Sequence, residues 1–340
     1  MSPWMRWDAL WYQRIAIQGY SATDGTAPFH PLFAWLATPL IRIGICPSLS
    51  LLMISSLAGI ALFYCFFKLA QLDLLPNDAS FALILLAFAP PAFILFAPYP
   101  EGLFLLTSVL CLFFARQKLW WLSGLMGGLA TLTRQQGLFL FFPMIVELWE
   151  NSQRELKVLI KKWRDWITLG LIPVGMLVWL LYRAFFINDV QISTSNFQEF
   201  IYSALISPSA TQVVPTQKFI WPWQAFYYSF LKLVTQPDLD VWVDLITGIF
   251  FLIILAITWK KMRLSYRVYS LVIALVSFSF YTGSAHPYMG LSRHLFLAFP
   301  IFIGLATSIN KMWARFLVVG FSAISMFFLL LLYGLNTWVP

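Results

Sequence analysis

The sequence has 340 residues, of which 60% are hydrophobic and only 11% are charged. A soluble globular protein carries about 25% charged residues, because its water-facing surface needs them, so this composition excludes a soluble enzyme. Apolar stretches of roughly 15 to 25 residues recur through most of the chain and predict an all-α membrane protein with several spanning helices. The net charge is +8, from 22 basic and 14 acidic residues, and the placement of the basic residues is more informative than their sum.

Residues 3–20 have the pattern of an amphipathic helix that lies along the membrane surface. Pro3 suits a first helical turn, and Gly19 suits a helix end. Four apolar side chains fall on one side at helical spacing: Trp4, Trp7, Trp11 and Ile15. The segment has no apolar run after a basic start, so we predict neither a signal peptide nor a spanning helix here.

Asp8 is the first candidate catalytic residue, because it lies one helical turn from both Trp4 and Tyr12. A carboxylate that is partly desolvated among aromatic rings has the tuned proton affinity that a general base needs. Tyr12 is then a candidate substrate contact. The alternative is a solvated aspartate near a helix start, where the helix dipole favours a negative charge.

Residues 28–45 predict a second surface helix, since prolines flank His30 and the segment ends before Pro47, where a true span begins. His30 is a candidate ligand for a phosphate. Its alternative role is a hydrogen bond to a backbone carbonyl.

Ten apolar segments are candidate spans, and several are shorter than the roughly 20 residues that cross a bilayer, which predicts tilted or broken helices within 101–149. The candidate spans are 47–70, 79–97, 101–116, 119–133, 137–149, 166–187, 241–259, 268–284, 295–309 and 316–334. We divide the chain into four regions: 1–46 with the surface helices, 47–187 as a first bundle, 188–240 as an outer loop and 241–340 as a second bundle.

Basic residues set the orientation of these spans. If residues 1–46 lie outside, eight of the 22 basic residues also fall outside: Arg6, Arg14, Arg42, Arg134, Arg183, Lys218, Lys232 and Arg293. The other fourteen fall inside, and the cluster from Arg154 to Arg164 contributes most of the bias. An outer N-terminal segment needs something ahead of it to start translocation, so we expect a first spanning helix to precede this sequence.

Glu101 and Arg134 are ionisable residues at places where apolar runs meet. Glu101 follows Tyr99 and Pro100 at the outer start of a span, and Tyr99 is a candidate substrate contact. Arg134 interrupts an otherwise continuous apolar stretch. A charge near mid-membrane costs about 2.5 to 3.5 kcal/mol on insertion scales, so it usually marks a cavity, a partner or a site. The roles left open for Glu101 are a second catalytic acid, an acceptor ligand and a partner for Arg134. Arg134 has the alternative of snorkelling to the outer headgroups.

The outer side also holds the long connection 188–240, whose aromatic residues around 221–228 predict a helix in the headgroup layer. The alternative is an aromatic belt without a ligand. Arg293 and His294, together with Arg134, His30 and Arg183, are candidates for an electropositive substrate pocket on the side of Asp8 and Glu101. The sequence lacks the GxxxxGKS/T, HExxH and GxSxG patterns, and its three cysteines have no CxxC spacing, so we expect no cofactor, no metal ligand and no disulfide.

Five blocks of the sequence resemble the PIG-V family of mannosyltransferases and its bacterial homologues. The blocks are WDALWYQRIAIQGY, FHPLF, PYPEGLFLL, GGLATLTRQQGLFLFFP and SRHLFLAFPIF. Their order and approximate spacing follow the family pattern over nearly the whole chain. Two positions depart from it, because His30 stands where Phe is common and Pro100 replaces Ser or Thr before Glu101.

This resemblance implies the GT-C architecture, a helical membrane bundle with juxtamembrane helices on its outer face and a sugar donor carried on polyprenyl phosphate. It places Asp8 at the family's first-loop aspartate, Glu101 at the acidic position after Tyr99, and Arg134 and Arg293 at its recurrent arginines. The short chain and short loops suggest a bacterial homologue in the plasma membrane, whereas a eukaryotic member would lie in the ER membrane.

The predicted activity is inverting transfer of mannose or a related hexose from a polyprenyl-phosphate sugar to a glycolipid or glycan acceptor at the outer membrane face. The predicted partners are this donor, the acceptor and the lipid bilayer, with no nucleic acid. The main alternative is a transporter or lipid flippase, which also needs intramembrane charges and broken helices. A third possibility is a catalytically silent scaffold that binds a partner through its aromatic outer loop.

Overall fold

The computed structural model describes residues 4–189, 218–335 and 337, and the described chain is almost entirely helical. Among these residues the one sheet is a short antiparallel pair of strands, β1 (Lys218–Phe219) and β2 (Phe280–Tyr281). The chain forms two compact units. The first contains Met1–Leu62 and Leu95–Gln217, and the second contains Phe63–Ile94 and Lys218–Pro340.

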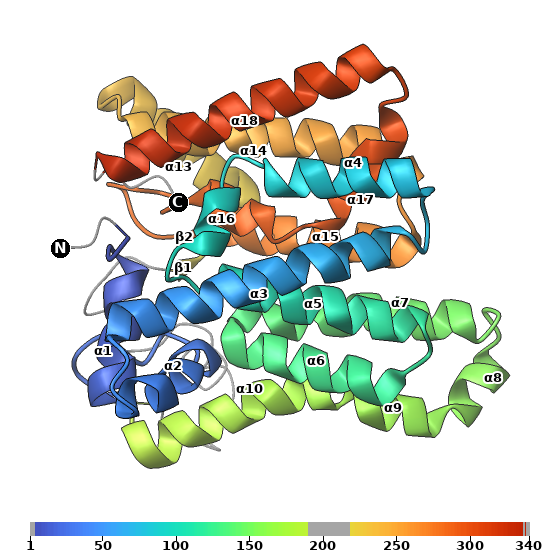
Figure 1. Cartoon of the computed structure of the whole chain (residues 1–340), viewed down its shortest axis with the longest axis horizontal. Helices are drawn as coiled ribbons and strands as arrows, with labels where there is room; N and C mark the ends of the chain where they lie inside the picture. The colour runs from blue at the N-terminus through green and yellow to red at the C-terminus, as the bar shows by residue number, and fades with distance from the viewer. Residues whose placement is uncertain (1–3, 190–217, 336, 338–340) are drawn as a thin grey trace. The chain divides into compact units, whose positions relative to one another are not determined.

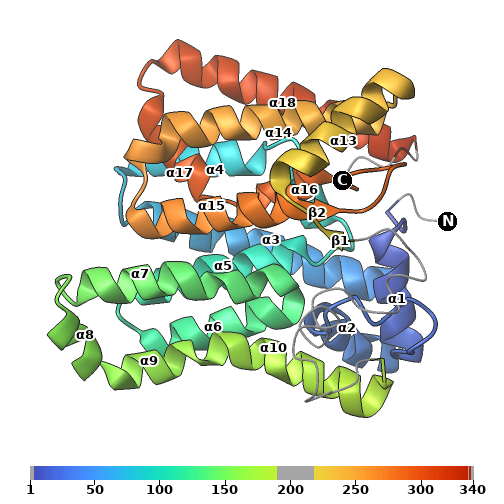
Figure 2. The ribbon, with the colours of Figure 1, turned by 180° about the vertical axis from the view of Figure 1, so that it is seen from behind.

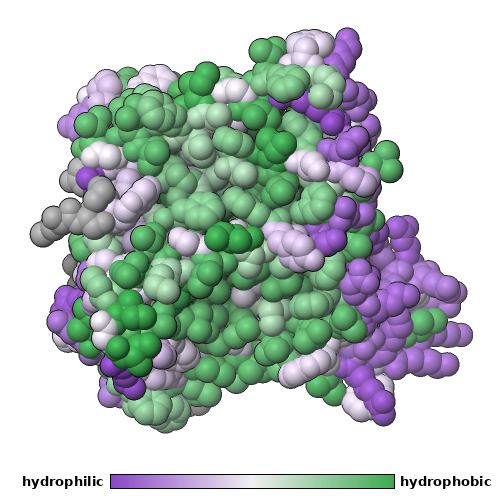
Figure 3. Space-filling view, viewed as in Figure 1, coloured by the Kyte–Doolittle hydropathy of each residue, from purple (hydrophilic) through white to green (hydrophobic). Residues whose placement is uncertain are grey.

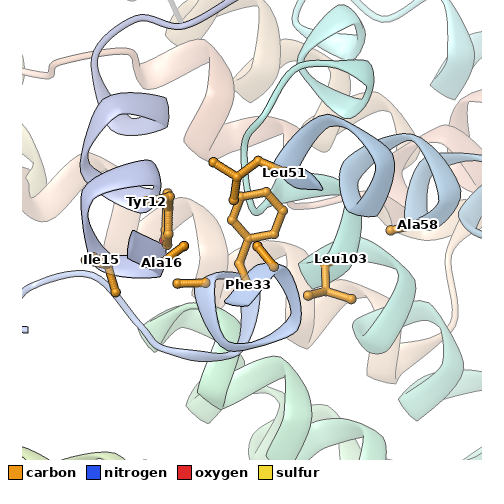
Figure 4. Packing of buried hydrophobic residues seen from close by; sticks show 9 residues of the cluster. Tyr12, Ile15, Ala16, Phe33, Leu51, Ala58 and Leu103 are labelled. Atoms are coloured by element: carbon orange, nitrogen blue, oxygen red, sulfur yellow. The ribbon is translucent and has the colours of Figure 1, made fainter. Parts of the chain in front are cut away.

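In the first unit, the helices α1 (Asp8–Gln18) and α2 (Leu32–Arg42) pack against each other near the start of α3 (Pro47–Ala70) (Figure 1). Their apolar side chains share one core, in which Tyr12 and Ala16 of α1 face Phe33 of α2 (Figure 4). Leu51 of α3 and Leu103 complete this core. Burial of such side chains stabilises each by roughly 1.5 to 3 kcal/mol, which fixes α1 on its neighbours.

The start of the first predicted helix was wrong. The helix begins at Asp8 rather than at Pro3, because the preceding Trp7 has a φ of 44° and breaks the helical path. The predicted end is confirmed, since Gly19 follows the last helical residue with a φ of 84°.

The rest of the first unit is a set of helices that run side by side (Figures 1 and 2). The elements are α5 (Glu101–Arg116), α6 (Trp120–Thr133), the 3-10 helix η2 (Gln135–Leu140), α7 (Phe141–Asn151), α8 (Leu156–Lys161), α9 (Trp163–Leu169), α10 (Leu171–Tyr182) and the π-helical η3 (Arg183–Ile187). Glycines let α6 approach α9 and α10 closely. An added Cβ on Gly124 would lie 1.9 Å from the carbonyl oxygen of Thr168, and one on Gly128 would lie 2.8 Å from that of Leu171. Gly124 and Gly128 form the G-x-x-x-G spacing that allows such contacts between membrane helices.

The second unit consists mainly of helices from the C-terminal half. They are α4 (Pro76–Ala87), α13 (Pro222–Thr235), α14 (Leu239–Thr258), η4 (Trp259–Lys261), α15 (Leu264–Ser279), α16 (Leu291–Phe296), α17 (Pro300–Ser308) and α18 (Met312–Gly334), with the 3-10 helix η1 (Ala92–Phe96) at the unit boundary. α17 packs on both α4 and α14. An ion pair of 2.5 Å between Arg315 and Asp78 ties the start of α18 to α4.

Within the described part of the chain, four helices are long and apolar enough to cross a membrane: Pro47–Ala70, Trp163–Ile187, Leu239–Lys261 and Met312–Gly334. The predicted span 47–70 agrees with α3 in both bounds. The predicted span 295–309 is broken between α16 and α17, and the span 137–149 begins as the 3-10 helix η2. The predicted helix around 221–228 is present as α13, whereas residues 190–217 of the same predicted outer loop lie outside the described residues.

The outer faces of the long helices are apolar. On α18, Phe316, Phe321 and Ile324 are each more than 60% exposed. Figure 3 shows a hydrophobic surface over the long helices of the first unit, whereas hydrophilic residues gather at the end formed by α8. Such continuous apolar surface is unstable in water but suits lipid, so the predicted all-α polytopic membrane fold is confirmed.

Candidate functional site

Asp8 is the first residue of α1 and is partly exposed. Trp7 before it has a φ of 44° and a ψ of −115°, which a bulky residue rarely adopts. Backbone strain of this kind often lies beside functional groups, because surrounding contacts must hold it in place. Asp8 is therefore held at a defined point where the chain changes direction.

The segment before Asp8 is bound to the turn before α5. The buried Tyr99 donates a hydrogen bond of 3.3 Å from its hydroxyl to the carbonyl oxygen of Arg6. The carbonyl of Tyr99 in turn accepts a hydrogen bond of 3.2 Å from Ser55 of α3. The turn that leads into Glu101 thus also positions the residues that lead into Asp8.

Glu101 and Arg134 form a buried ion pair in the first unit. The Glu101 side chain is fully buried and that of Arg134 is 11% exposed. Arg134 follows the last residue of α6 in an extended conformation, and it also donates a hydrogen bond of 3.4 Å from Nε to Gln136. Of the roles left open for Glu101, the structure shows that of a partner for Arg134. A snorkelling Arg134 is not what the structure shows, because its guanidinium group is buried in protein.

His30 is buried, and its Nδ1 lies 2.6 Å from the carbonyl oxygen of Thr131 on α6. A carbonyl oxygen only accepts, so Nδ1 carries the proton and donates, which leaves Nε2 as the unprotonated nitrogen. The pKa of His30 is lowered to about 3, mainly by burial and in addition by the positive charges of Arg183 and Arg134, while the hydrogen bond to Thr131 opposes this shift. His30 is therefore neutral near pH 7, and the prediction that it adds positive charge to the pocket is wrong.

Arg183 is the other basic residue near His30, and it is paired as well. Its Nε lies 3.1 Å from Oδ1 of Asp189, and its Nη2 lies 2.7 Å from Oδ2. Both side chains are almost fully buried, at 2% and 1% exposure. The sequence did not indicate that Asp189 pairs with Arg183. An Asp six residues after an Arg does not by itself predict the π-helical turn that brings the two side chains together.

The two tyrosines predicted to contact substrate have rings in the protein interior. Tyr12 is 3% exposed and packs edge-on against Phe29 and Phe33, with ring centroids 5.3 Å and 5.1 Å apart. Tyr99 is fully buried. Substrate contact by either residue stays a prediction.

Arg293 and His294 belong to the second unit, where both lie on α16. Arg293 is buried, and the ring of His294 lies 6.4 Å from that of Phe280. Asp244 of α14 accepts a hydrogen bond of 2.8 Å from the backbone N–H of Leu291, the first residue of α16, and so fixes where this helix begins. A shared pocket of these residues with Arg134 stays a prediction.

A cluster in the second unit was missed by the sequence reasoning. Asp238, Asp240 and His286 place their oxygen and nitrogen atoms within 4.8 Å of one another. The signal present in the sequence is the Asp-Leu-Asp pattern at 238–240, together with a histidine in the loop before Arg293. The expectation that the chain contains no metal ligands did not take this cluster into account.

Comparison with known proteins identifies the fold. No protein-family model matches the chain, and no curated protein matches it in sequence. Two solved structures of ArnT from Cupriavidus metallidurans are similar to it. The apo form has a TM-score of 0.55 at 15% identity over 94% of this chain and 57% of the ArnT chain. The form bound to undecaprenyl phosphate has a TM-score of 0.54 at 16% identity over 94% of this chain and 58% of the ArnT chain.

The chain thus spans little more than half the length of ArnT. The likeness shows that this chain shares its fold with ArnT, and the predicted all-α membrane architecture is confirmed. The narrower resemblance to PIG-V mannosyltransferases stays a prediction.

Proposed function

We propose that this protein is a membrane glycosyltransferase that moves a mannose or related hexose, with inversion, from a polyprenyl-phosphate carrier to a glycolipid or glycan acceptor. The observation that carries the proposal is the fold, which is similar over 94% of the chain to an ArnT structure that holds undecaprenyl phosphate. The membrane setting of the chain suits a donor whose polyprenyl tail lies in lipid.

In the proposed reaction, Asp8 accepts the proton of the acceptor hydroxyl as the hydroxyl oxygen attacks the anomeric carbon. The bond between the anomeric carbon and the phosphate oxygen breaks, and the polyprenyl phosphate leaves with the bonding electron pair. Asp8 is the better base of the two acidic candidates, because it is partly exposed whereas Glu101 is buried and paired with a guanidinium group.

Arg134 supplies positive charge for the departing phosphate in this proposal. A guanidinium group binds phosphate oxygens strongly, and stabilisation of developing charge at a dry site is usually a large part of catalysis. Glu101 positions Arg134 through the buried ion pair. His30 contributes as a neutral group, with Nε2 as a hydrogen-bond acceptor for a donor on substrate. The transfer step needs no nucleotide and no metal.

The proposal places this chemistry at the outer face of a bacterial plasma membrane, as the basic inner cluster suggests. Transporters share intramembrane charges but form no new glycosidic bond. Product formation therefore separates the two functions.

The test is a transfer assay with membranes that contain the protein and a radiolabelled polyprenyl-phosphate mannose. Asp8→Asn is expected to lower turnover by about 10² to 10⁴-fold, the usual contribution of a general base, because the amide cannot accept the proton. Asp165→Asn is the matched control, since Asp165 is another partly exposed aspartate at the start of a helix in the same unit and is expected to leave turnover unchanged. Full turnover by Asp8→Asn would remove Asp8 from this role, and no labelled product from the unaltered protein with any lipid-linked sugar would overturn the proposal.

A further inference from the structure

The start of α14 brings two aspartates to a histidine from a loop that lies 46 residues further along the chain. Oδ2 of Asp240 lies 2.6 Å from Nδ1 of His286, and the carboxyl groups of Asp238 and Asp240 are within hydrogen-bonding distance. All three ligand atoms lie within 4.8 Å of one another. Carboxylates this close repel each other unless a proton or a cation lies between them.

Oδ1 of Asp240 accepts a hydrogen bond of 3.1 Å from the backbone N–H of Val241, whereas its Oδ2 faces His286. Asp238 occupies the N-cap position of α14 but makes no capping hydrogen bond with its side chain. Nδ1 of His286 is shielded from solvent, and among the described residues it has no partner with hydrogen-bond geometry despite its closeness to Asp240. Oδ2 of Asp240 and Nδ1 of His286 thus face each other at ion-pair distance, and the Asp238 side chain beside them does not serve as a helix cap.

Hydrogen bonds hold the loop that carries His286 in a defined conformation. Thr282 donates from its backbone N–H to the carbonyl oxygen of Pro287 at 3.1 Å, and from its hydroxyl to the carbonyl oxygen of His286. One turn along α14, Asp244 binds the N–H of Leu291 where the loop ends. The loop 282–290 is therefore held on both sides of His286, which keeps the imidazole facing the two carboxylates.

The geometry points to a binding site for a first-row divalent cation, with Zn²⁺ as the best match, formed by Asp238, Asp240 and His286. Mixed imidazole and carboxylate ligands suit Zn²⁺, whereas Mg²⁺ and Ca²⁺ prefer oxygen ligands alone. Tetrahedral ligands about 2.1 Å from Zn²⁺ are roughly 3.4 Å apart, which lies between the closest and the widest separations in the cluster. The side chain of His286 is 44% exposed, so the cation can enter from solvent and a water molecule can complete its coordination.

The bound cation would fasten the loop 282–290 to the start of α14. Because α16 follows this loop directly, the cation would also fix the helix that carries Arg293 and His294. Its role is to position the loop and α16, and it does not depend on the proposed glycosyl transfer.

The test measures Zn²⁺ binding by the purified full chain in detergent, after removal of metals with a chelator. Calorimetry and elemental analysis are expected to show one Zn²⁺ per chain with micromolar affinity. Asp240→Asn and His286→Gln should each weaken binding by about 100-fold or more, since each removes a ligand atom. Glu155→Gln is the control, because Glu155 is an exposed acid of the first unit. Equal affinity in all variants, or displacement of Zn²⁺ by equimolar Ca²⁺, would overturn the assignment.

A second measurement works on the unaltered protein and needs no variant to fold. Diethyl pyrocarbonate modifies the unprotonated nitrogen of an imidazole, and a cation on Nδ1 leaves Nε2 protonated. Zn²⁺ is therefore expected to slow modification of His286 at least about tenfold, as read by mass spectrometry. An unchanged rate at His286 in saturating Zn²⁺ would contradict the site.

Discussion

Asp8 and Glu101 are each the first residue of a helix, yet the structure gives them different surroundings. Both gain from the helix dipole, which stabilises a negative charge at this position. Glu101 is fully buried and forms an ion pair with Arg134, so its negative charge is already compensated. Asp8 is partly exposed at a strained turn. The two carboxyl groups differ in burial and in ion pairing, and the spacing of residues in the sequence indicates neither property.

The neutral state of His30 predicts a pH effect on stability. Its pKa is about 3 in the folded protein and about 6.5 in an unfolded chain, so below pH 6.5 the unfolded chain binds a proton that the folded protein does not. Stability is expected to fall by about 1.4 kcal/mol per pH unit as the pH drops from 6.5 towards 3, and to be unaffected by this group above pH 6.5. Thermal unfolding in detergent at pH 7.5 and pH 5 measures the effect.

The matched variant is His30→Asn, because the amide nitrogen of Asn can still donate to Thr131 but does not titrate. Other acidic groups titrate in both proteins, so the comparison isolates His30. An equal loss of melting temperature in the two proteins would show that His30 is already charged in the folded state.

At the scale of helices, α6 packs closely on α9 and α10 because the glycines at these contacts have no side chains. Gly124→Ala places a methyl group 1.9 Å from the carbonyl oxygen of Thr168, so the helices must move apart. Overpacking of this kind usually costs about 1 to 3 kcal/mol. Because α6 leads directly to Arg134, the variant is also expected to lower transfer activity.

Gly320→Ala is the control for this variant. Gly320 lies on α18 with open space around its Cβ position, and Ala favours a helix by roughly 1 kcal/mol over Gly. Thermal unfolding should therefore show a lower melting temperature for Gly124→Ala and an equal or higher one for Gly320→Ala. A drop of the same size in both variants would mean that the close helix contact is not the cause.

Helix boundaries were predictable where a residue with a local role marks them. α3 begins at Pro47 and α5 at Glu101, as expected from residues that favour a first helical turn. Other boundaries depend on contacts between helices. Gly137 packs closely on the backbone of Thr131, and the segment begins as a 3-10 helix, which no hydrophobic period indicates. Trp7 makes α1 begin later than predicted, through a backbone angle that Trp rarely adopts.

For the whole molecule, composition was sufficient to predict a helical membrane protein, but it could not show which distant residues meet. Glu101 and Arg134 are 33 positions apart, and their pairing follows from how α5 packs on α6. Asp240 and His286 are likewise brought together only by the fold. The sequence thus indicated which residues are candidates for a site, but it did not indicate which residues pair with them.

The orientation of the molecule gives a further prediction. If the basic cluster lies inside, Lys157→Cys is expected to react with a membrane-impermeant maleimide only after cells are permeabilised. Thr23→Cys should react in intact cells, because it lies in the loop between α1 and α2 on the predicted outer side. Both positions are exposed, so access to the reagent differs only by the side of the membrane. The native Cys46, Cys65 and Cys111 are free and are first replaced by Ala. Labelling of Lys157→Cys in intact cells would reverse the orientation.

The hydroxyl of Tyr99 holds the backbone at Arg6, across 93 positions of sequence. This has a consequence for chimeric proteins designed to test the proposed transfer. An N-terminal segment transplanted from a relative to change acceptor preference would arrive without the loop that orients it, and its aspartate would point elsewhere. Exchange of both blocks together, residues 4–20 and 97–103, is the smallest graft that preserves the relation between them.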